Sequence, residues 1–132
     1  MEMEVVFPGG KKVDAQYKGF TIRTDQSAAN GGEGSAPAPF DLFLSSIGTC
    51  VGIYVLEFCR TRKIPTETLK LHIRFSRNTE KKMVEKAAIE IQLPKEFPGK
   101  YVNAIIRAAE LCTVKKHLQD PPSFEIVTKT AD

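Results

Sequence analysis

Hydrophobic and polar positions alternate along the first 24 residues of the chain, which is the spacing of half-buried β-strands. The alternation runs over residues 5–7, 13–17 and 20–24. The segments between them, Pro8-Gly9-Gly10 and Lys18-Gly19, are typical of turns. The pattern therefore predicts a three-stranded meander at the start of the chain.

The next segment, residues 25–39, shows no apolar period and is rich in glycine, alanine, serine and proline. A linker between domains is one interpretation of this composition. We favour an ordered or semi-ordered lead-in to the following element, because that element begins abruptly and is well specified.

Residues 40–62 have the pattern of a long helix, with Pro39 in its first turn and Ile64-Pro65 at its end. No charged residue occurs from Leu42 to Leu56, a stretch shorter than the roughly 20 residues of a membrane span. Charges flank this stretch, so we expect no membrane partner. A helix that is apolar all round must be covered on all sides. One small sheet covers one side, so we expect a homodimer, in which small residues such as Gly48 admit a second backbone.

Alternation returns at residues 69–76 and 87–93, which predicts an antiparallel hairpin. Helical spacing follows over residues 100–111 and 112–119, and a last short alternation at 124–126 predicts a final strand. The predicted order is β-β-β-α-β-β-α-α-β. Strands in runs, separated by helices, indicate an α+β fold.

Composition narrows the class of protein further. A length of 132 residues suits a single domain covering residues 1–132. A net charge of +3 is too small to indicate a nucleic-acid partner. The two scattered histidines, His72 and His117, lack the paired spacing of metal ligands, so we expect no metal and no cofactor. Three cysteines form no disulfide framework and the acidic N-terminus lacks the features of a signal peptide, so we expect a cytoplasmic protein.

Two cysteines are candidates for chemistry. Cys50 lies midway along the apolar helix, and Cys112 lies 62 positions later, where the third predicted helix begins. Both helices should pack against one core, so the thiols could meet, one of them near a helix N-terminus that lowers thiol pKa values. A redox pair and two small buried hydrophobic side chains are both compatible with this pattern. Cys59 is about 13 Å from Cys50 along the helix and should only fill core space.

Two carboxylates near Cys50 differ in their place on the helix. Asp41 lies two and a half turns earlier and projects from the opposite side of the helix. There it would interact favourably with the positive end of the helix dipole. It could approach a thiol only if that thiol belonged to another helix or another chain. Glu57 shares the face of Cys50. It could support the thiol, stay solvated or pair with Arg60.

Two segments resemble the OsmC/Ohr family, which comprises osmotically inducible protein C and the organic hydroperoxide resistance proteins. They are GSAPAPFDLFLSSIGTC at residues 34–50 and AAELCTVKKHL at residues 108–118. The first is similar to the family's entry to its central helix and the second to its Cys-Pro-Val segment. The resemblance extends to the element order along nearly the whole chain.

The resemblance implies an OsmC-like fold, an intertwined homodimer with antiparallel sheets around long central helices and active sites at the subunit interface. It also implies a thiol-dependent peroxidase active in oxidative stress. Cys50 would attack an organic hydroperoxide and become a sulfenic acid. Cys112 would condense with it to a disulfide, which a cellular dithiol would then reduce.

The sequence departs from the family's hydroperoxidases at three places. Their glutamate ten residues before the first cysteine is Phe40 here, with Asp41 one place later. The only arginine before the first cysteine is Arg23, in surroundings unlike the family's arginine motif. Thr113 replaces the usual proline. Asp41, Glu57 and Arg23 remain candidate supporting residues, and the alternative function is a non-catalytic dimer that binds a small apolar or sulfur-containing ligand.

Overall fold

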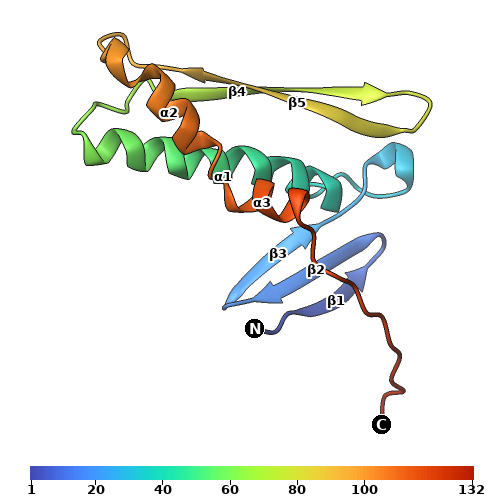
Figure 1. Ribbon diagram of the computed structural model, residues 1–132. Coiled ribbons are helices and arrows are strands. Elements are labelled where there is room, and N and C mark those ends of the chain that lie inside the picture. Colours follow the sequence, from blue (N-terminus) through green and yellow to red (C-terminus); the bar gives the residue numbers. More distant parts are fainter. The chain divides into compact units, whose positions relative to one another are not determined.

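The computed structural model describes all residues from 1 to 132 and divides the chain into two compact units, Met1–Ser46 and Ile47–Asp132. Figure 1 labels the elements along the chain. Helix α1 (Pro39–Thr61) begins in the first unit and ends in the second.

The first unit contains the predicted meander. Its strands β1 (Glu4–Gly9), β2 (Lys12–Tyr17) and β3 (Phe20–Thr24) form one antiparallel sheet in the order β1-β2-β3. Lys18 and Gly19 join β2 to β3 with positive φ angles of 50° and 81°. Two positive φ angles in a two-residue connection fit the twist of a tight hairpin. The alternation of the sequence and its turn residues thus specify this sheet together.

A buried carboxylate organises the loop after β3, which includes the short 3-10 helix η1 (Ala28–Asn30). Asp25 is only 1% exposed. Its Oδ2 accepts hydrogen bonds from the Ser35 hydroxyl at 2.6 Å, the Ser35 N–H at 3.1 Å and the Glu33 N–H at 3.3 Å. Its Oδ1 accepts the Gln26 N–H at 2.7 Å. The Ser35 hydroxyl and these N–H groups hold the pKa of Asp25 at about 2. The loop is thus an ordered lead-in to α1, as the sequence indicates.

The end of α1 is closed by a backbone motif. Lys63 adopts a left-handed φ of 55° just beyond the helix. The N–H of Ile64 then reaches back to the carbonyl of Cys59 at 2.9 Å, and the N–H of Lys63 to that of Arg60 at 3.1 Å. This pair of bonds is the Schellman arrangement, which satisfies the last carbonyls of a helix.

The second unit contains the predicted hairpin, β4 (Lys70–Asn78) paired antiparallel with β5 (Met83–Gln92). Ile73 lies opposite Ile89 in the ladder and is half-buried. A Cβ atom placed on Gly48 would lie 2.7 Å from Cδ1 of Ile73. Gly48 therefore makes room for a side chain of β4 in the same chain, and the expectation that it admits a second backbone is corrected.

The predicted helix over residues 100–111 divides into a 3-10 turn, η2 (Gly99–Tyr101), and α2 (Val102–Ala109). The third predicted helix is α3 (Thr113–Gln119). Residues of α1, α2 and the start of α3 form one core cluster: Val51, Val55, Phe58, Cys59, Ile105 and Cys112. By length and composition alone α1 could cross a membrane, but core helices of soluble proteins pass the same test.

The predicted final strand does not form. Residues after Gln119 follow an irregular course to the C-terminus, and Phe124 and Ile126 are 87% and 93% exposed (Figure 1). The alternation is present in the sequence, but a strand also needs a hydrogen-bonded neighbour. No strand of this chain pairs with the segment.

Candidate functional site

The two predicted cysteines meet in the second unit. Cys50 lies on α1, and Cys112 is the N-cap residue of α3. The Cys112 thiol donates a hydrogen bond to the sulfur of Cys50, and neither cysteine is in a disulfide. Cys50 is half-buried, whereas Cys112 is fully buried. The structure thus brings together two free thiols from positions far apart in the sequence, and only one of them is open to solvent.

Main-chain N–H groups at the start of α3 surround this pair. The N–H groups of Thr113 and Val114 donate to the sulfur of Cys50. The N–H of Lys115 donates to Sγ of Cys112 at 3.5 Å, which makes this thiol an N-cap acceptor. The first N–H groups of a helix lack partners within the helix, so they are available to these sulfurs.

The two thiols differ in acidity. Burial raises the pKa of Cys50, but the N–H of Val114, the Cys112 thiol and the N–H of Thr113 outweigh it, so this pKa lies below its ordinary value. Burial raises the pKa of Cys112 above its ordinary value, and the adjacent Cys50 sulfur raises it further. A lowered pKa increases the thiolate fraction, which is the nucleophilic form. Of the two thiols, Cys50 is therefore the one that forms a thiolate more readily.

This result corrects one expectation from the sequence. The helix start was expected to lower the pKa of Cys112, the cysteine beside it. The free N–H groups of Thr113 and Val114 instead point at the sulfur of Cys50 on the neighbouring helix. The direction of those groups depends on how α3 packs against α1, which sequence position alone does not specify.

A hydrogen bond between two hydroxyl groups joins α1 to α3 beside the pair. The phenol oxygen of Tyr54 lies 3.0 Å from Oγ1 of Thr113. Tyr54 follows Cys50 by one helical turn and so lies on the same face of α1. Sequence reasoning did not identify Tyr54, and its four-residue spacing from Cys50 is the signal that could have found it.

Cys59 is separate from this site. It has no exposed surface, and burial raises its pKa, although the Arg62 guanidinium counteracts part of the effect. That guanidinium lies 3.6 Å from the centroid of the Phe58 ring and covers this end of the core. Cys59 fills core space, as expected.

The three candidate supporting residues have ordinary structural surroundings. Oδ2 of Asp41 accepts the N–H of Ala38 at 3.0 Å, which is the contact of a carboxylate at the start of a helix. Arg23 is exposed on β3, opposite Asp14 of β2. Glu57 is exposed, makes no ion pair with its helix neighbours and does not shift the pKa of Cys50. Arg23 and Asp41 belong to the first unit and Glu57 to the second.

No group of three or more histidine, cysteine or acidic side chains is placed to hold a metal ion. His72 is exposed on β4. His117 is exposed on α3, where its Nδ1 lies 2.7 Å from the carbonyl oxygen of Thr113.

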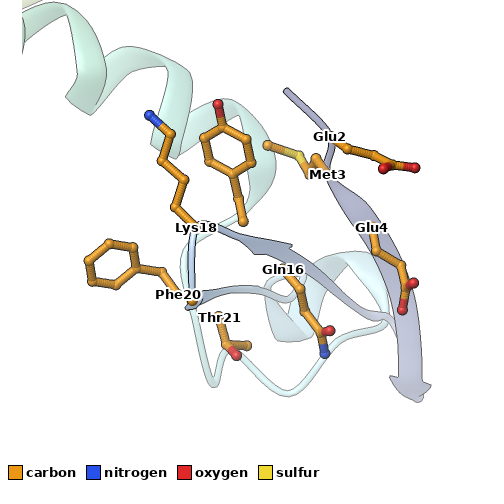
Figure 2. A pocket seen from close by; sticks show the side chains of 9 residues that line it. Glu2, Met3, Glu4, Gln16, Lys18, Phe20 and Thr21 are labelled. Atoms are coloured by element: carbon orange, nitrogen blue, oxygen red, sulfur yellow. The ribbon is translucent and has the colours of Figure 1, made fainter.

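A hollow on the first unit has no cysteine or histidine in its lining. Figure 2 shows Lys18, Phe20 and Glu4 extending in different directions around it. Its lining comprises Glu2, Met3, Glu4, Gln16, Tyr17, Lys18, Gly19, Phe20 and Thr21. These side chains converge on no common point, so the hollow provides no candidate chemistry.

The fold and the site together define an α+β protein with a dithiol site in which one thiol is activated. Residues 32–127 match the model of the OsmC-like protein family, and the chain belongs to that family. A search of curated protein sequences finds no significant match.

Several solved structures share the fold. A protein of Psychrobacter arcticus 273-4, described in terms of osmotic stress induction and a detoxification response, has a TM-score of 0.72 at 22% identity, covering 86% of this chain and 85% of its own. The OsmC-like protein from Mycoplasma pneumoniae has a TM-score of 0.70 at 14% identity, covering 91% and 87%. A Legionella pneumophila protein has a TM-score of 0.59 at 17% identity, covering 89% and 88%. It is described as an organic hydroperoxide resistance protein OsmC, a predicted redox protein and a regulator of sulfide bond formation.

Proposed function

We propose that the protein is a thiol-dependent peroxidase that reduces organic hydroperoxides in defence against oxidative stress. The observation that carries this proposal is the unequal thiol pair. Cys50 is accessible and has a lowered pKa, while the buried Cys112 thiol already donates a hydrogen bond to its sulfur. Membership of the OsmC-like family supports the same chemistry.

The reaction follows from the two thiols. The Cys50 thiolate attacks the outer oxygen of the hydroperoxide, the O–O bond breaks, and the alkoxide takes a proton and leaves as an alcohol. Cys50 is then a sulfenic acid. The Cys112 sulfur attacks it and a disulfide forms, with release of water. A cellular dithiol reduces this disulfide by thiol–disulfide exchange and becomes a disulfide itself.

We also propose that the active form is a homodimer. Large apolar side chains remain exposed in the second unit, among them Ile53 of α1 at 49% and Ile106 of α2 at 46%. An obligate dimer of this kind should bury at least ~2,000 Å². A stable monomer in light scattering at micromolar concentration would contradict the dimer.

The peroxidase proposal is tested by hydroperoxide consumption with dithiothreitol as reductant, comparing tert-butyl hydroperoxide with hydrogen peroxide. The organic peroxide should be consumed faster. One equivalent should produce an intrachain disulfide between Cys50 and Cys112, identified by mass spectrometry of non-reduced digests. Cys59→Ser is the matched control and should form the same disulfide. If Cys50 stays a free thiol in excess organic hydroperoxide, the peroxidase proposal is wrong.

One observation favours a second candidate, a non-catalytic dimer that binds a small apolar or sulfur-containing ligand. Phe40 occupies the position of the glutamate in the family's hydroperoxidases. It stacks on Phe43 with ring centroids 5.6 Å apart, and both rings are exposed. This candidate predicts that an apolar thiol binds without consumption of hydroperoxide, and that Phe40→Ala weakens the binding.

A further inference from the structure

We propose that Tyr54 and Thr113 are positioning residues for Cys50, because their hydroxyl–hydroxyl bond fixes the start of α3 against α1 with its N–H groups aimed at the Cys50 sulfur. This inference rests on the proposed function, since it concerns the readiness of Cys50 as a nucleophile. Neither hydroxyl touches the reacting atoms, so both residues act through the backbone that they hold.

The hydrogen bond between Tyr54 and Thr113 lies close to the Cys50 sulfur. Tyr54 is four residues after Cys50 on α1, so the two side chains lie one above the other on the same face. Its phenol oxygen is 3.0 Å from Oγ1 of Thr113, the first residue of α3. The N–H of Thr113 itself donates to the Cys50 sulfur. One residue therefore provides both the hydroxyl that fixes the helix start and an N–H group that contacts the nucleophile.

Charged groups do not provide an alternative explanation within the second unit. No charged side chain of that unit shifts the pKa of Cys50, and the one titratable group that does so is the Cys112 thiol. The remaining contacts come from main-chain N–H groups of residues 113 and 114. Hydrogen-bond strength falls steeply as the donor angle departs from linear. The orientation of this backbone segment therefore decides how well the thiolate is stabilised.

The identity of residue 113 matters because of what proline would lack there. Proline has neither an N–H group nor a hydroxyl. Thr113 supplies both. Its N–H gives the Cys50 sulfur a second main-chain donor, and its hydroxyl gives Tyr54 a partner.

The test is the pH dependence of Cys50 alkylation by iodoacetamide, measured on the full chain by peptide mass spectrometry. Tyr54→Phe and Thr113→Val should each move the profile of Cys50 to higher pH. Each should also slow its alkylation on the acid limb by about twofold to tenfold, the range expected for one net hydrogen bond. Thr113→Ser, which restores a hydroxyl, should recover most of the loss. Thr113→Pro, which removes the N–H group as well, should show the largest shift.

A double variant makes the test specific. Tyr54→Phe and Thr113→Val remove the same bond, so the combined variant should be no slower than either alone. Tyr101→Phe is the matched control, because it removes a phenol hydroxyl elsewhere in the same unit and should leave the profile in place. An unchanged profile in Tyr54→Phe, or additive losses in the double variant, would overturn the inference.

Peroxide turnover of the unaltered protein is measured separately, so the two proposals can fail independently. If the protein consumes no hydroperoxide but Tyr54→Phe still shifts the alkylation profile, the peroxidase proposal fails and the positioning role stands. If turnover is present but the profile does not move, the positioning role fails and the peroxidase proposal stands.

Discussion

Replacing Gly32 by alanine should disrupt the loop between β3 and α1, because there is no space for a methyl group. A Cβ at this position would lie 2.0 Å from the main-chain oxygen of Gln26 and 2.8 Å from Oδ1 of Asp25. Heavy atoms attract one another at roughly 3.5–4.0 Å, so both distances are strongly repulsive. Gly32 has no left-handed φ angle, so its requirement for glycine is steric.

The magnitude follows from which atoms would have to move. Overpacking generally costs about 1–3 kcal/mol. Here the nearest atom belongs to the backbone, which cannot rotate away as a side chain can, so we expect the upper end of that range. A loss of about 3 kcal/mol is a large part of the 5–15 kcal/mol that stabilises a typical domain. Gly34→Ala is the matched control in the same loop, because nothing lies within 4 Å of its Cβ and only its left-handed φ of 64° opposes alanine. That conformation costs about 1–2 kcal/mol.

Urea unfolding followed by far-UV circular dichroism gives the stability of each variant. Hydrogen exchange of the Glu33 and Ser35 amides reports on the loop itself, because both N–H groups donate to Asp25. Both amides should exchange faster in Gly32→Ala. The steric argument is refuted if Gly32→Ala is as stable as Gly34→Ala, or if these amides keep their protection.

Three further predictions concern acid stability, the two glycines of α1 and the second thiol. Asp25 has a pKa of about 2 in the folded protein, below its unfolded value of about 3.9, so its contribution to the free energy of unfolding is present above pH ~4 and should be lost as the pH falls towards 2. Urea unfolding midpoints measured across this pH range should show the decline. The Asp25→Asn variant should lack it. A Cβ at Gly52 has open space around it, so Gly52→Ala should gain about 1 kcal/mol of stability from helix propensity. A Cβ at Gly48 would lie 2.7 Å from the Cδ1 methyl group of Ile73, so Gly48→Ala should melt at a lower temperature than Gly52→Ala. Equal melting temperatures of the two variants would contradict this. Cys112→Ser should leave Cys50 as a sulfenic acid after one equivalent of organic hydroperoxide, detected as a dimedone adduct; absence of the adduct would count against a resolving role.

The regular elements could be predicted because each carries a period in its sequence. The hairpin of β4 and β5 follows from strict alternation, in which residues such as Leu71 and Ile73 face inward while Lys70 and His72 face solvent. Helix α1 follows from its long uncharged run and from the Ile64-Pro65 stop. These signals are local, so the structure reproduces them to within a few residues.

Features that depend on a distant partner could not be predicted in the same way. Phe124 and Ile126 alternate like a strand, yet a strand exists only where another offers an open edge. Asp25 is an ordinary loop residue by sequence, and its burial appears only once the chain folds back to bring Ser35 against it. A local sequence pattern carries no information on whether a strand has a pairing partner or on which distant residue covers a buried carboxylate.

The candidate site was predicted in part. Placing Cys50 and Cys112 on two core-facing helices was sufficient to predict that they could meet, while two separate buried thiols remained compatible with the sequence. Their unequal acidity was not predicted, because it depends on where the N–H groups of Thr113 and Val114 point. That direction is set by the packing of α3 on α1, and Tyr54 contributes to it through a contact 59 positions along the chain.

The unequal burial of the thiols determines how many cysteines react with a thiol reagent in the folded protein. The chain contains three cysteines, but Cys59 and Cys112 have no exposed surface, and only Cys50 can be reached from solvent. A chromogenic thiol reagent should therefore register one rapid equivalent per folded chain and three after denaturation. A fluorescent maleimide added under native conditions should likewise attach at a single position, without removal of the other two cysteines. The fold thus provides a site-specific label at the residue whose chemistry is in question.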